Sequence, residues 1–164
     1  PISSLYTLAD VINAGCRDGE LDVRGISHRG YFASITNFRS YHDANMDLID
    51  YKTATDLFHD NWPIYTRTNN SCPTHYFDTA NVSNSVISNG SMIEGTVENS
   101  IVGRGCTIKK GAVIKNCVVL ADCTIGENVH IENLVVDKHA KITHAKEIIR
   151  PADEPGYIKR NDTL

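Results

Sequence analysis

Residues 84–142 read NSVISNGSMIEGTVEN (84–99), SIVGRGCTIKKGAVIKN (100–116), CVVLADCTIGENVHIEN (117–133) and LVVDKHAKI (134–142), and these four passages share one pattern. Asparagines recur at positions 84, 99, 116 and 133, in steps of 15, 17 and 17 residues. Within each passage an aliphatic residue returns about every six positions, as in Val102, Ile108 and Ile114. Such hexapeptide repeats are typical of a parallel β-helix, which we predict for residues 82–145.

The repeat also predicts which side chains face inward. A small or modest residue stands two positions before most of the aliphatic ones, as Cys106 does before Ile108 and Cys123 before Ile125. Residues two apart on a strand point to the same side, so both members of each pair are expected to fill the core. Three facets of about six residues make one triangular coil. The similarity to hexapeptide-repeat proteins implies that the coils wind left-handedly.

The recurring asparagines predict a ladder along one corner of the coils. Asparagine tolerates the positive φ of a tight corner, and its amide can bond to the next rung. We therefore interpret Asn84, Asn99, Asn116 and Asn133 as structural residues rather than as a binding site.

Composition narrows the classes of function. The chain has 164 residues and a formal net charge of −4, and its basic residues are scattered, which argues against a nucleic-acid partner. It contains no apolar run of the ~20 residues that a membrane span needs. None of the cysteines forms a CxxC pair, and three of them, Cys106, Cys117 and Cys123, take inward positions of the repeat. Reduced core cysteines predict a cytoplasmic protein without a cysteine-bound metal.

Residues before the repeats predict a mixture of helices and strands. The pattern favours helices over 3–15, 37–50 and 53–59, and strands over 21–27 and 31–35. These elements are too few for an independent α/β sheet, and the chain begins at Pro1 without an initiator methionine. We therefore expect residues 1–65 to be the end of a larger domain.

The chain is thereby divided into four parts. The end of the α/β domain (1–65) is followed by a polar linker containing Pro73 (66–81). The β-helix (82–145) comes next, and the hexapeptide period is lost over residues 146–164, for which we predict an irregular C-terminal cap.

Three segments together resemble one known family. GYFASITNFRSYHDANMDLID (30–50), NWPIYT (61–66) and the hexapeptide repeats are similar to the C-terminal part of ADP-glucose pyrophosphorylase (glucose-1-phosphate adenylyltransferase). The resemblance covers roughly residues 28–145. It implies a nucleotidyltransferase segment before a left-handed β-helix, and a role in making ADP-glucose and pyrophosphate from ATP and glucose 1-phosphate for glycogen synthesis. In that family the β-helix supports oligomer assembly and contributes to allosteric control.

Two departures from the family pattern favour a regulatory subunit. The glycine-rich nucleotide loop is absent, so this chain is expected to be inactive by itself. Ser34 occupies the position at which catalytic members carry a metal-binding aspartate. A hydroxyl is a poor substitute for a carboxylate on Mg²⁺, and we predict neither catalytic residues nor a metal or cofactor in this chain. The resemblance implies a homologous catalytic subunit, or a second copy, as the partner.

The resemblance also implies a sugar-phosphate effector. Arg24, Arg29 and Arg39 would suit a phosphate if the fold brought them together, and the simpler interpretation is a solvated strand edge.

The sequence also admits three other activities. The parent protein is a working nucleotidyltransferase if another residue replaces the missing aspartate. His139 and His144 have the spacing of two zinc ligands in hexapeptide-repeat carbonic anhydrases, but no histidine stands near 103–105 to complete the set. His130 or His139 would be the catalytic base of a hexapeptide acyltransferase.

Overall fold

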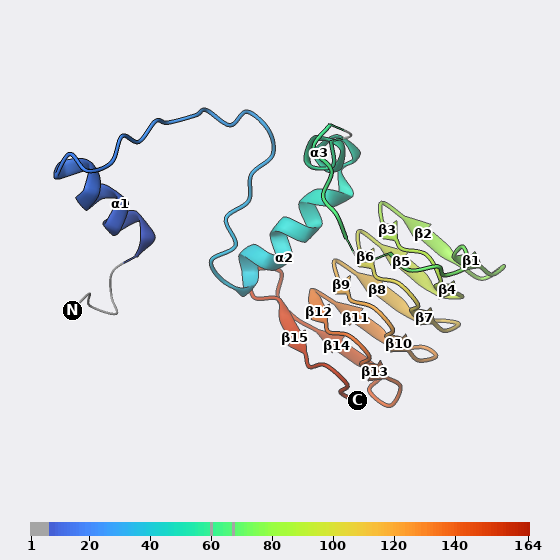
Figure 1. The fold of residues 1–164 in the computed structure, drawn as a ribbon. Coiled ribbons are helices and arrows are strands. Elements are labelled where there is room, and N and C mark those ends of the chain that lie inside the picture. The colour runs from blue at the N-terminus through green and yellow to red at the C-terminus, as the bar shows by residue number, and fades with distance from the viewer. Residues whose placement is uncertain (1–6, 60, 67) are drawn as a thin grey trace. The chain divides into compact units, whose positions relative to one another are not determined.

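The computed structural model describes residues 7–59, 61–66 and 68–164, and the chain divides into two compact units, 1–30 and 31–164 (Figure 1). In the first unit, helix α1 (Leu8–Arg17) begins at a capping box. Thr7 accepts a hydrogen bond from the Asp10 backbone N–H, and the Asp10 carboxylate accepts one from the Thr7 N–H in return. This exchange satisfies two N–H groups that a helix start otherwise leaves unpaired.

The second unit is dominated by a parallel β-helix, which we call the rod (residues 75–158). Its strands form three parallel sheets of five strands, each following one facet of the coils. Sheet A contains β1 (His75–Tyr76), β4 (Met92–Ile93), β7 (Thr107–Ile108), β10 (Thr124–Ile125) and β13 (Lys141–Ile142). Sheet B contains β2 (Asn81–Ser83), β5 (Thr96–Glu98), β8 (Val113–Lys115), β11 (His130–Glu132) and β14 (Glu147–Ile149). Sheet C contains β3 (Val86–Ile87), β6 (Ile101–Val102), β9 (Val118–Val119), β12 (Leu134–Val136) and β15 (Gly156–Ile158).

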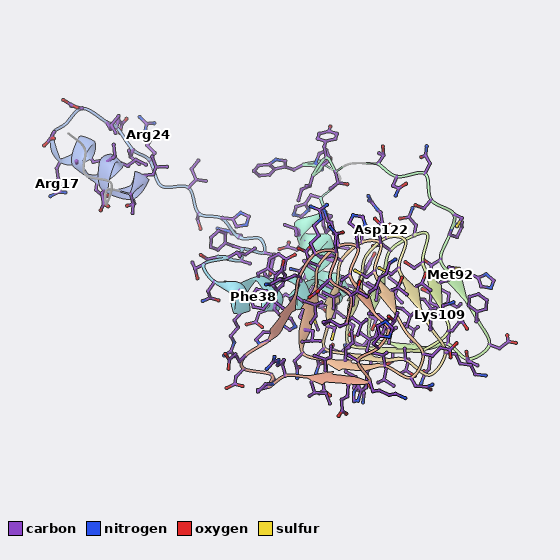
Figure 2. The ribbon with its side chains drawn as sticks, turned by 90° about the horizontal axis from the view of Figure 1, so that it is seen from below. Arg17, Arg24, Phe38, Met92, Lys109 and Asp122 are labelled. Atoms are coloured by element: carbon purple, nitrogen blue, oxygen red, sulfur yellow. The ribbon has the colours of Figure 1, made fainter. Side chains whose placement is uncertain are left out.

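The register confirms the predicted β-helix and its inward residues. Ile93, Ile108, Ile125 and Ile142 are consecutive partners in sheet A, and all four are fully buried. The outward residues of the same sheet, such as Met92, lie on the surface of the rod, as does Lys109 at the following corner (Figure 2). The core therefore runs along the axis of the rod as stacked rows of aliphatic side chains. The handedness of the winding stays a prediction.

Backbone conformations with positive φ mark the corners. Asn84, Asn99, Asn116 and Asn133 turn the chain from sheet B to sheet C with φ between 42° and 56°. Asp122 and His139 adopt the same conformation at the corner between sheets C and A. Asparagine and aspartate tolerate this region better than other residues with a side chain, which explains their recurrence here.

One tight corner explains why the first repeat step is 15 residues rather than 17. Strand β4 passes to β5 through only Glu94 and Gly95, whereas the next coil uses residues 109–112 at the same place. A Cβ atom on Gly95 would lie 2.5 Å from the carbonyl oxygen of Ala112, so only glycine fits this shortened corner.

The rod extends beyond the predicted boundaries at both ends. Strand β1 and the first residue of β2 lie within the predicted linker (66–81), and β14 and β15 lie within residues 146–164. The prediction of an irregular cap is therefore wrong. The small-x-aliphatic pair is sparser in these outer coils, where Ala80-Asn81-Val82 and Gly156-Tyr157-Ile158 carry it, and hydrogen bonding to the neighbouring coil joins them to the rod.

Residues 7–59, 61–66 and 68–74, which precede the rod, are helical or irregular. Helix α2 (Phe38–Met46), the 3₁₀ helix η1 (Asp47–Ile49) and helix α3 (Tyr51–Leu57) follow one another directly. The strands predicted over 21–27 and 31–35 are absent, because a strand needs a partner and no described segment pairs with either. No helix in the described part of the chain is long and apolar enough to cross a membrane.

Candidate functional site at the junction of helix α2 and the rod

The outer face of sheet C is apolar. Its outward row consists of Val86, Ile101, Val118, Val135 and Tyr157, in register from coil to coil. Val118 and Val135 point away from the rod's core and are nevertheless buried, because helix α2 packs against this face (Figure 1). Covering these two valines supplies about 1.5–3 kcal/mol each toward holding the helix on the rod.

Helix α2 begins at a second capping box. The Ser40 backbone N–H donates to Asn37 Oδ1 at 2.8 Å, and the Asn37 backbone N–H donates to Ser40 Oγ at 3.0 Å. The residues Asn-Phe-Arg-Ser thus fix where the helix starts, and this places Phe38, Arg39 and His42 within its first turns.

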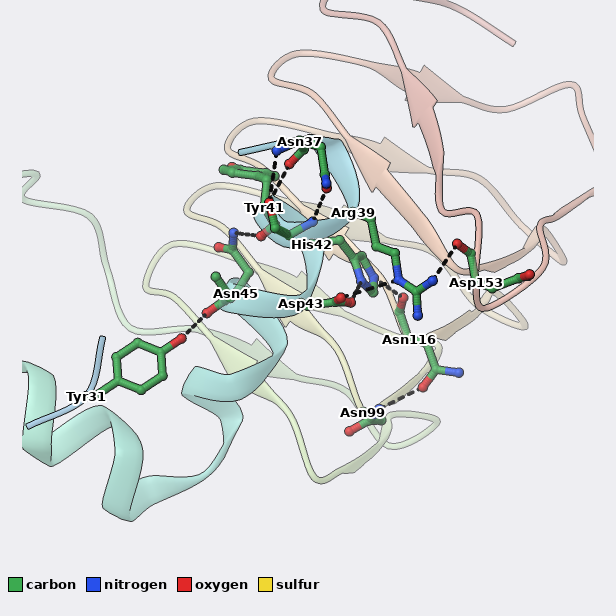
Figure 3. Close-up of polar contacts among 12 residues, drawn as sticks. Tyr31, Asn37, Arg39, Tyr41, His42, Asp43, Asn45, Asn99, Asn116 and Asp153 are labelled. Carbon is green, nitrogen blue, oxygen red and sulfur yellow. Dashed lines mark hydrogen bonds and ion pairs between the residues drawn. The ribbon is translucent and has the colours of Figure 1, made fainter. Parts of the chain in front are cut away.

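His42 is the buried polar residue of the junction. The residue is 7% exposed, and Nε2 lies 3.0 Å from the carbonyl oxygen of Asn116 (Figure 3). Nε2 therefore carries the proton and donates, because a carbonyl oxygen can only accept. Nδ1 lies 3.4 Å from Asp43 Oδ1 on the same helix. The hydrogen bond from Nε2 ties α2 to a corner asparagine in the middle of the rod.

Arg39 and Phe38 reach the last coil. Arg39 Nη1 donates to the carbonyl oxygen of Asp153 at 3.2 Å, and its Nε forms an ion pair with Asp43 at 3.5 Å (Figure 3). The Phe38 ring meets the ring of Tyr157 edge to face, with centroids 5.7 Å apart. Helix α2 therefore also contacts the last coil of the rod, besides the face formed by Val118 and Val135.

The corner asparagines continue from the junction toward the first coil. Asn84 Nδ2 donates to Asn99 Oδ1 at 2.8 Å, and Asn99 Nδ2 donates to Asn116 Oδ1 at 2.7 Å. Asn133 turns away, and its Nδ2 donates to the carbonyl oxygen of Arg150 at 2.6 Å. Asn116 thus belongs both to the ladder, through its side chain, and to the junction, through its carbonyl group.

The three predicted effector arginines lie in different units. Arg24 and Arg29 are exposed in the first unit, where Arg24 pairs with the equally exposed Asp22 at 3.1 Å. Arg39 lies in the second unit, at the junction, with its side chain 58% exposed. That the three form one cluster stays a prediction.

Ser34 is exposed in the irregular segment that leads into α2. Tyr31 anchors the start of this segment, because its hydroxyl donates to Asp47 Oδ2 at 3.0 Å and its backbone N–H donates to the Asp56 carboxylate. Among the described residues, no group of three or more His, Cys, Asp and Glu side chains is arranged to hold a metal ion. Ser34 offers a hydroxyl, a weaker ligand for Mg²⁺ than a carboxylate, and the expectation that this chain holds no metal stays a prediction.

Two cavities border the helical segment. One of about 410 Å³ has an apolar lining that includes Phe32, Ile35 and Leu48. The other, of about 530 Å³, lies between Asp47 of η1 and the exposed end of the ladder at Asn84. The carboxylates of Asp47 and Asp50 line the second cavity, which therefore disfavours an anionic ligand.

The histidines considered for other activities lie on the surface of the rod. His130 is placed between Glu132 and Glu147, at 3.7 and 3.6 Å, and His139 lies 3.7 Å from Asp122. The His130 ring is half-buried, and its Nε2 is buried without a hydrogen-bond partner among the described residues, whereas the His139 side chain is 45% exposed beside Asp122.

Sequence reasoning missed His42, Phe38 and Tyr157 as junction residues. Phe38 and His42 are four positions apart, the spacing that places two side chains on one face of a helix, so the pair was detectable. Nothing in the sequence near Tyr157 indicates that it meets Phe38.

Comparisons with known proteins agree with this architecture. The family model described as "GlmU-like, C-terminal hexapeptide" matches residues 73–154, half of the chain. The glycogen biosynthesis protein GlgD of Bacillus subtilis (strain 168) is 38% identical over 133 residues, which cover 81% of this chain and 39% of that protein. Glucose-1-phosphate adenylyltransferase of Geobacillus stearothermophilus is 41% identical over 86 residues, 52% of this chain and 22% of the enzyme.

A third relative gives the same picture. Glucose-1-phosphate adenylyltransferase of Bacillus mycoides (strain KBAB4) is 35% identical over 122 residues, covering 74% of this chain and 32% of the enzyme. The matched part thus spans well under half the length of each of these relatives. With its stacked hexapeptide coils and its matched family model, the chain belongs to the family of GlmU-like C-terminal hexapeptide domains.

Proposed function

We propose that this chain is the C-terminal assembly and regulatory region of a glucose-1-phosphate adenylyltransferase subunit in glycogen biosynthesis. The observation that carries the proposal is the junction itself. The rod is joined to the preceding segment through a helix that covers Val118 and Val135 and whose buried His42 bonds to the Asn116 carbonyl oxygen. A conformational change in a rod attached in this way can be transmitted through α2 to the segment before it. The relatives named above carry a comparable region.

We propose further that residues 1–65 are the end of an α/β nucleotidyltransferase domain and that the rod winds left-handedly. The exposed apolar side chains of Phe32, Ile35 and Trp62 support the first point, because large apolar groups are normally covered by protein in the complete molecule. A cytoplasmic location is part of the same proposal.

The subunit is proposed to regulate rather than to catalyse. Ser34 offers a hydroxyl where a metal site needs a carboxylate, and no metal-binding group of side chains surrounds it among the described residues. Its partner is then a homologous catalytic subunit, or a second copy of the same chain. Arg39, exposed on the surface of the junction, is the arginine of this unit that we propose for a sugar-phosphate effector.

The test is ADP-glucose synthesis by the full-length parent, alone and mixed with a catalytic homologue. We expect no turnover by the parent alone, and a raised or effector-sensitive rate in the mixture. A Ser34→Asp variant of the parent, with Ser34→Ala as its matched control, separates the effect of the carboxylate from that of losing the serine. Magnesium-dependent turnover by the unmodified parent alone would show instead that the chain is the tail of a working enzyme.

A further inference from the structure

The last coil carries a loop that the other coils lack. At the corner between sheets B and C, β5 passes to β6 through only Asn99 and Ser100. In the last coil, β14 ends at Ile149 and β15 begins at Gly156, so the connection is the longer segment 150–155, read RPADEP. We call this segment the corner loop.

The corner loop is held at both of its ends by one buried residue. Asn133, 6% exposed, donates from Nδ2 to the carbonyl oxygen of Arg150, and its own carbonyl oxygen accepts a hydrogen bond from the Gly156 backbone N–H at 2.9 Å. A turn inside the loop is closed by Glu154 N–H donating to the carbonyl oxygen of Pro151 at 3.1 Å. The loop therefore has a defined shape and presents its carbonyl groups in fixed directions.

The chain runs close to neighbouring side chains where the loop rejoins the rod. A Cβ atom on Gly156 would lie 2.6 Å from Leu134 Cδ2 and 2.7 Å from Arg150 Cγ. The chain passes close to the preceding coil at this point, and the loop that precedes it is directed outward, toward helix α2 (Figure 3).

The corner loop and Tyr157 meet the first turn of α2. Arg39 Nη1 donates to the Asp153 carbonyl oxygen while Asp43 holds Nε of the same guanidinium group. The Tyr157 ring, which contacts Phe38, is held in turn by its hydroxyl, which donates to Asp137 Oδ2 at 2.7 Å. The Arg39 side chain is thus held by Asp43 of α2, and the Tyr157 ring by Asp137 of the preceding coil.

We propose that the corner loop is a latch that couples the order of helix α2 to the order of the last coil. Val118 and Val135 give the helix its place on the face of sheet C, and the latch fixes its first turn to the end of the rod. The Arg39 side chain is 58% exposed, so the hydrogen bond to Asp153 competes with water and can open without unfolding the rod. When it opens, the first turn of α2 and residues 150–158 lose protection together.

Hydrogen exchange followed by mass spectrometry on the intact chain tests the latch. Arg39→Ala changes α2, and we expect faster exchange at a distance, in residues 150–158, by about threefold or more. Tyr157→Ala changes the last coil, and we expect a comparable increase in residues 38–46. This reciprocity distinguishes coupling from damage at the mutated position.

Two control variants define what the latch requires. Asp153→Ala should leave exchange in residues 38–46 unchanged, because Arg39 bonds to the backbone carbonyl of Asp153 and not to its carboxylate. Arg24→Ala removes an exposed arginine of the first unit, and should change exchange in neither segment. Unchanged protection of β7 and β10 shows that each variant keeps the rod folded.

Two outcomes would contradict the latch. If Arg39→Ala accelerates exchange only within α2, and Tyr157→Ala only within the last coil, the two elements are independent and the latch does not exist. Loss of protection throughout the rod in Arg39→Ala would also overturn the proposal, because the contact would then be part of the global fold.

Discussion

Asn99 combines two properties at one position of the rod. Its backbone has a φ of 45°, which most side chains disfavour, and its amide group bonds to both neighbouring rungs, Asn84 and Asn116. A residue placed there must tolerate the left-handed backbone and also satisfy two side-chain partners. Asparagine does both, whereas glycine does only the first.

Substitutions at Asn99 separate these two contributions. Asn99→Gly keeps the backbone conformation and loses both ladder bonds, and we expect a loss of about 1–2 kcal/mol in the free energy of unfolding. Asn99→Ala loses the bonds and adds backbone strain, for a total of about 2–4 kcal/mol. Urea denaturation of the two variants measures the difference, and equal losses would show that the conformation contributes nothing.

Ile125 gives a sharper residue-scale prediction. It is fully buried between Ile108 and Ile142, so Ile125→Asp places a carboxylate in the core without a partner. We expect a loss of more than about 4 kcal/mol and an unfolded rod in thermal denaturation. The neighbouring Thr124→Asp, directed to the outer face of the same strand, is the control and should fold. An unchanged melting temperature for Ile125→Asp would refute the register.

At the scale of single elements, the short helices depend on their caps. Helix α3 has no buried residue, and its start is held by Asp50, whose Oδ2 accepts hydrogen bonds from the Thr53 backbone N–H and from Thr53 Oγ1. These two bonds lower the pKa of Asp50 below its ordinary value of 3.8, because they favour the charged carboxylate. An exposed helix of this length depends on such a cap because it buries little of its own surface.

This cap predicts how α3 responds to acid. Because the pKa of Asp50 is lower in the folded protein, the cap is at full strength at pH values above 3.8 and is lost as the pH falls through the lowered value. The Thr53 amide signal in nuclear magnetic resonance should therefore shift, and α3 should fray, only below about pH 4. Asp50→Asn keeps a neutral cap and should abolish this acid step; a step that persists in Asp50→Asn would assign it to another group.

At the scale of the whole molecule, two faces of sheet C have different roles. The inward residues Val119 and Val136 belong to the core of the rod, and the outward residues Val118 and Val135 form the surface on which α2 packs. The strand pairs of β9 and β12 are therefore buried on both sides. This double burial is what connects the folding of the rod to the position of the segment before it.

Val135→Asp is expected to release the helix without unfolding the rod. The carboxylate cannot stay under α2 unpaired, and it becomes solvated once the helix leaves. Hydrogen exchange in residues 38–46 should rise by at least about tenfold while β7 and β10 remain protected. Val113→Asp, on the outer face of sheet B, is the matched control and should leave α2 in place. If Val135→Asp unfolded the rod as well, the surface under α2 and the core of the rod would unfold as one cooperative unit.

Features that depend on the repeated local sequence were predicted correctly, and features that depend on pairing with a distant segment were not. The coils between Val97 and Ile142 were predictable because each repeats the one before it, and stacking requires equivalent positions to match. The strands expected over 21–27 and 31–35 did not form, because alternating apolar residues do not make a strand without a neighbour to pair with. Strands β14 and β15 were missed because the regular hexapeptide period stops after Ile142, whereas pairing with the preceding coil continues the rod.

The rod can be read from the amino-acid sequence: the hexapeptide period specifies which side chains face inward, and the corner asparagines mark where the chain turns. These are local properties, repeated from coil to coil, and one repeat is evidence for the next. The folded chain was needed to show that α2 covers Val118 and Val135, that His42 bonds to Asn116, and that Arg39 reaches Asp153. These contacts join residues far apart in the chain, and neither partner carries a local pattern that specifies the other.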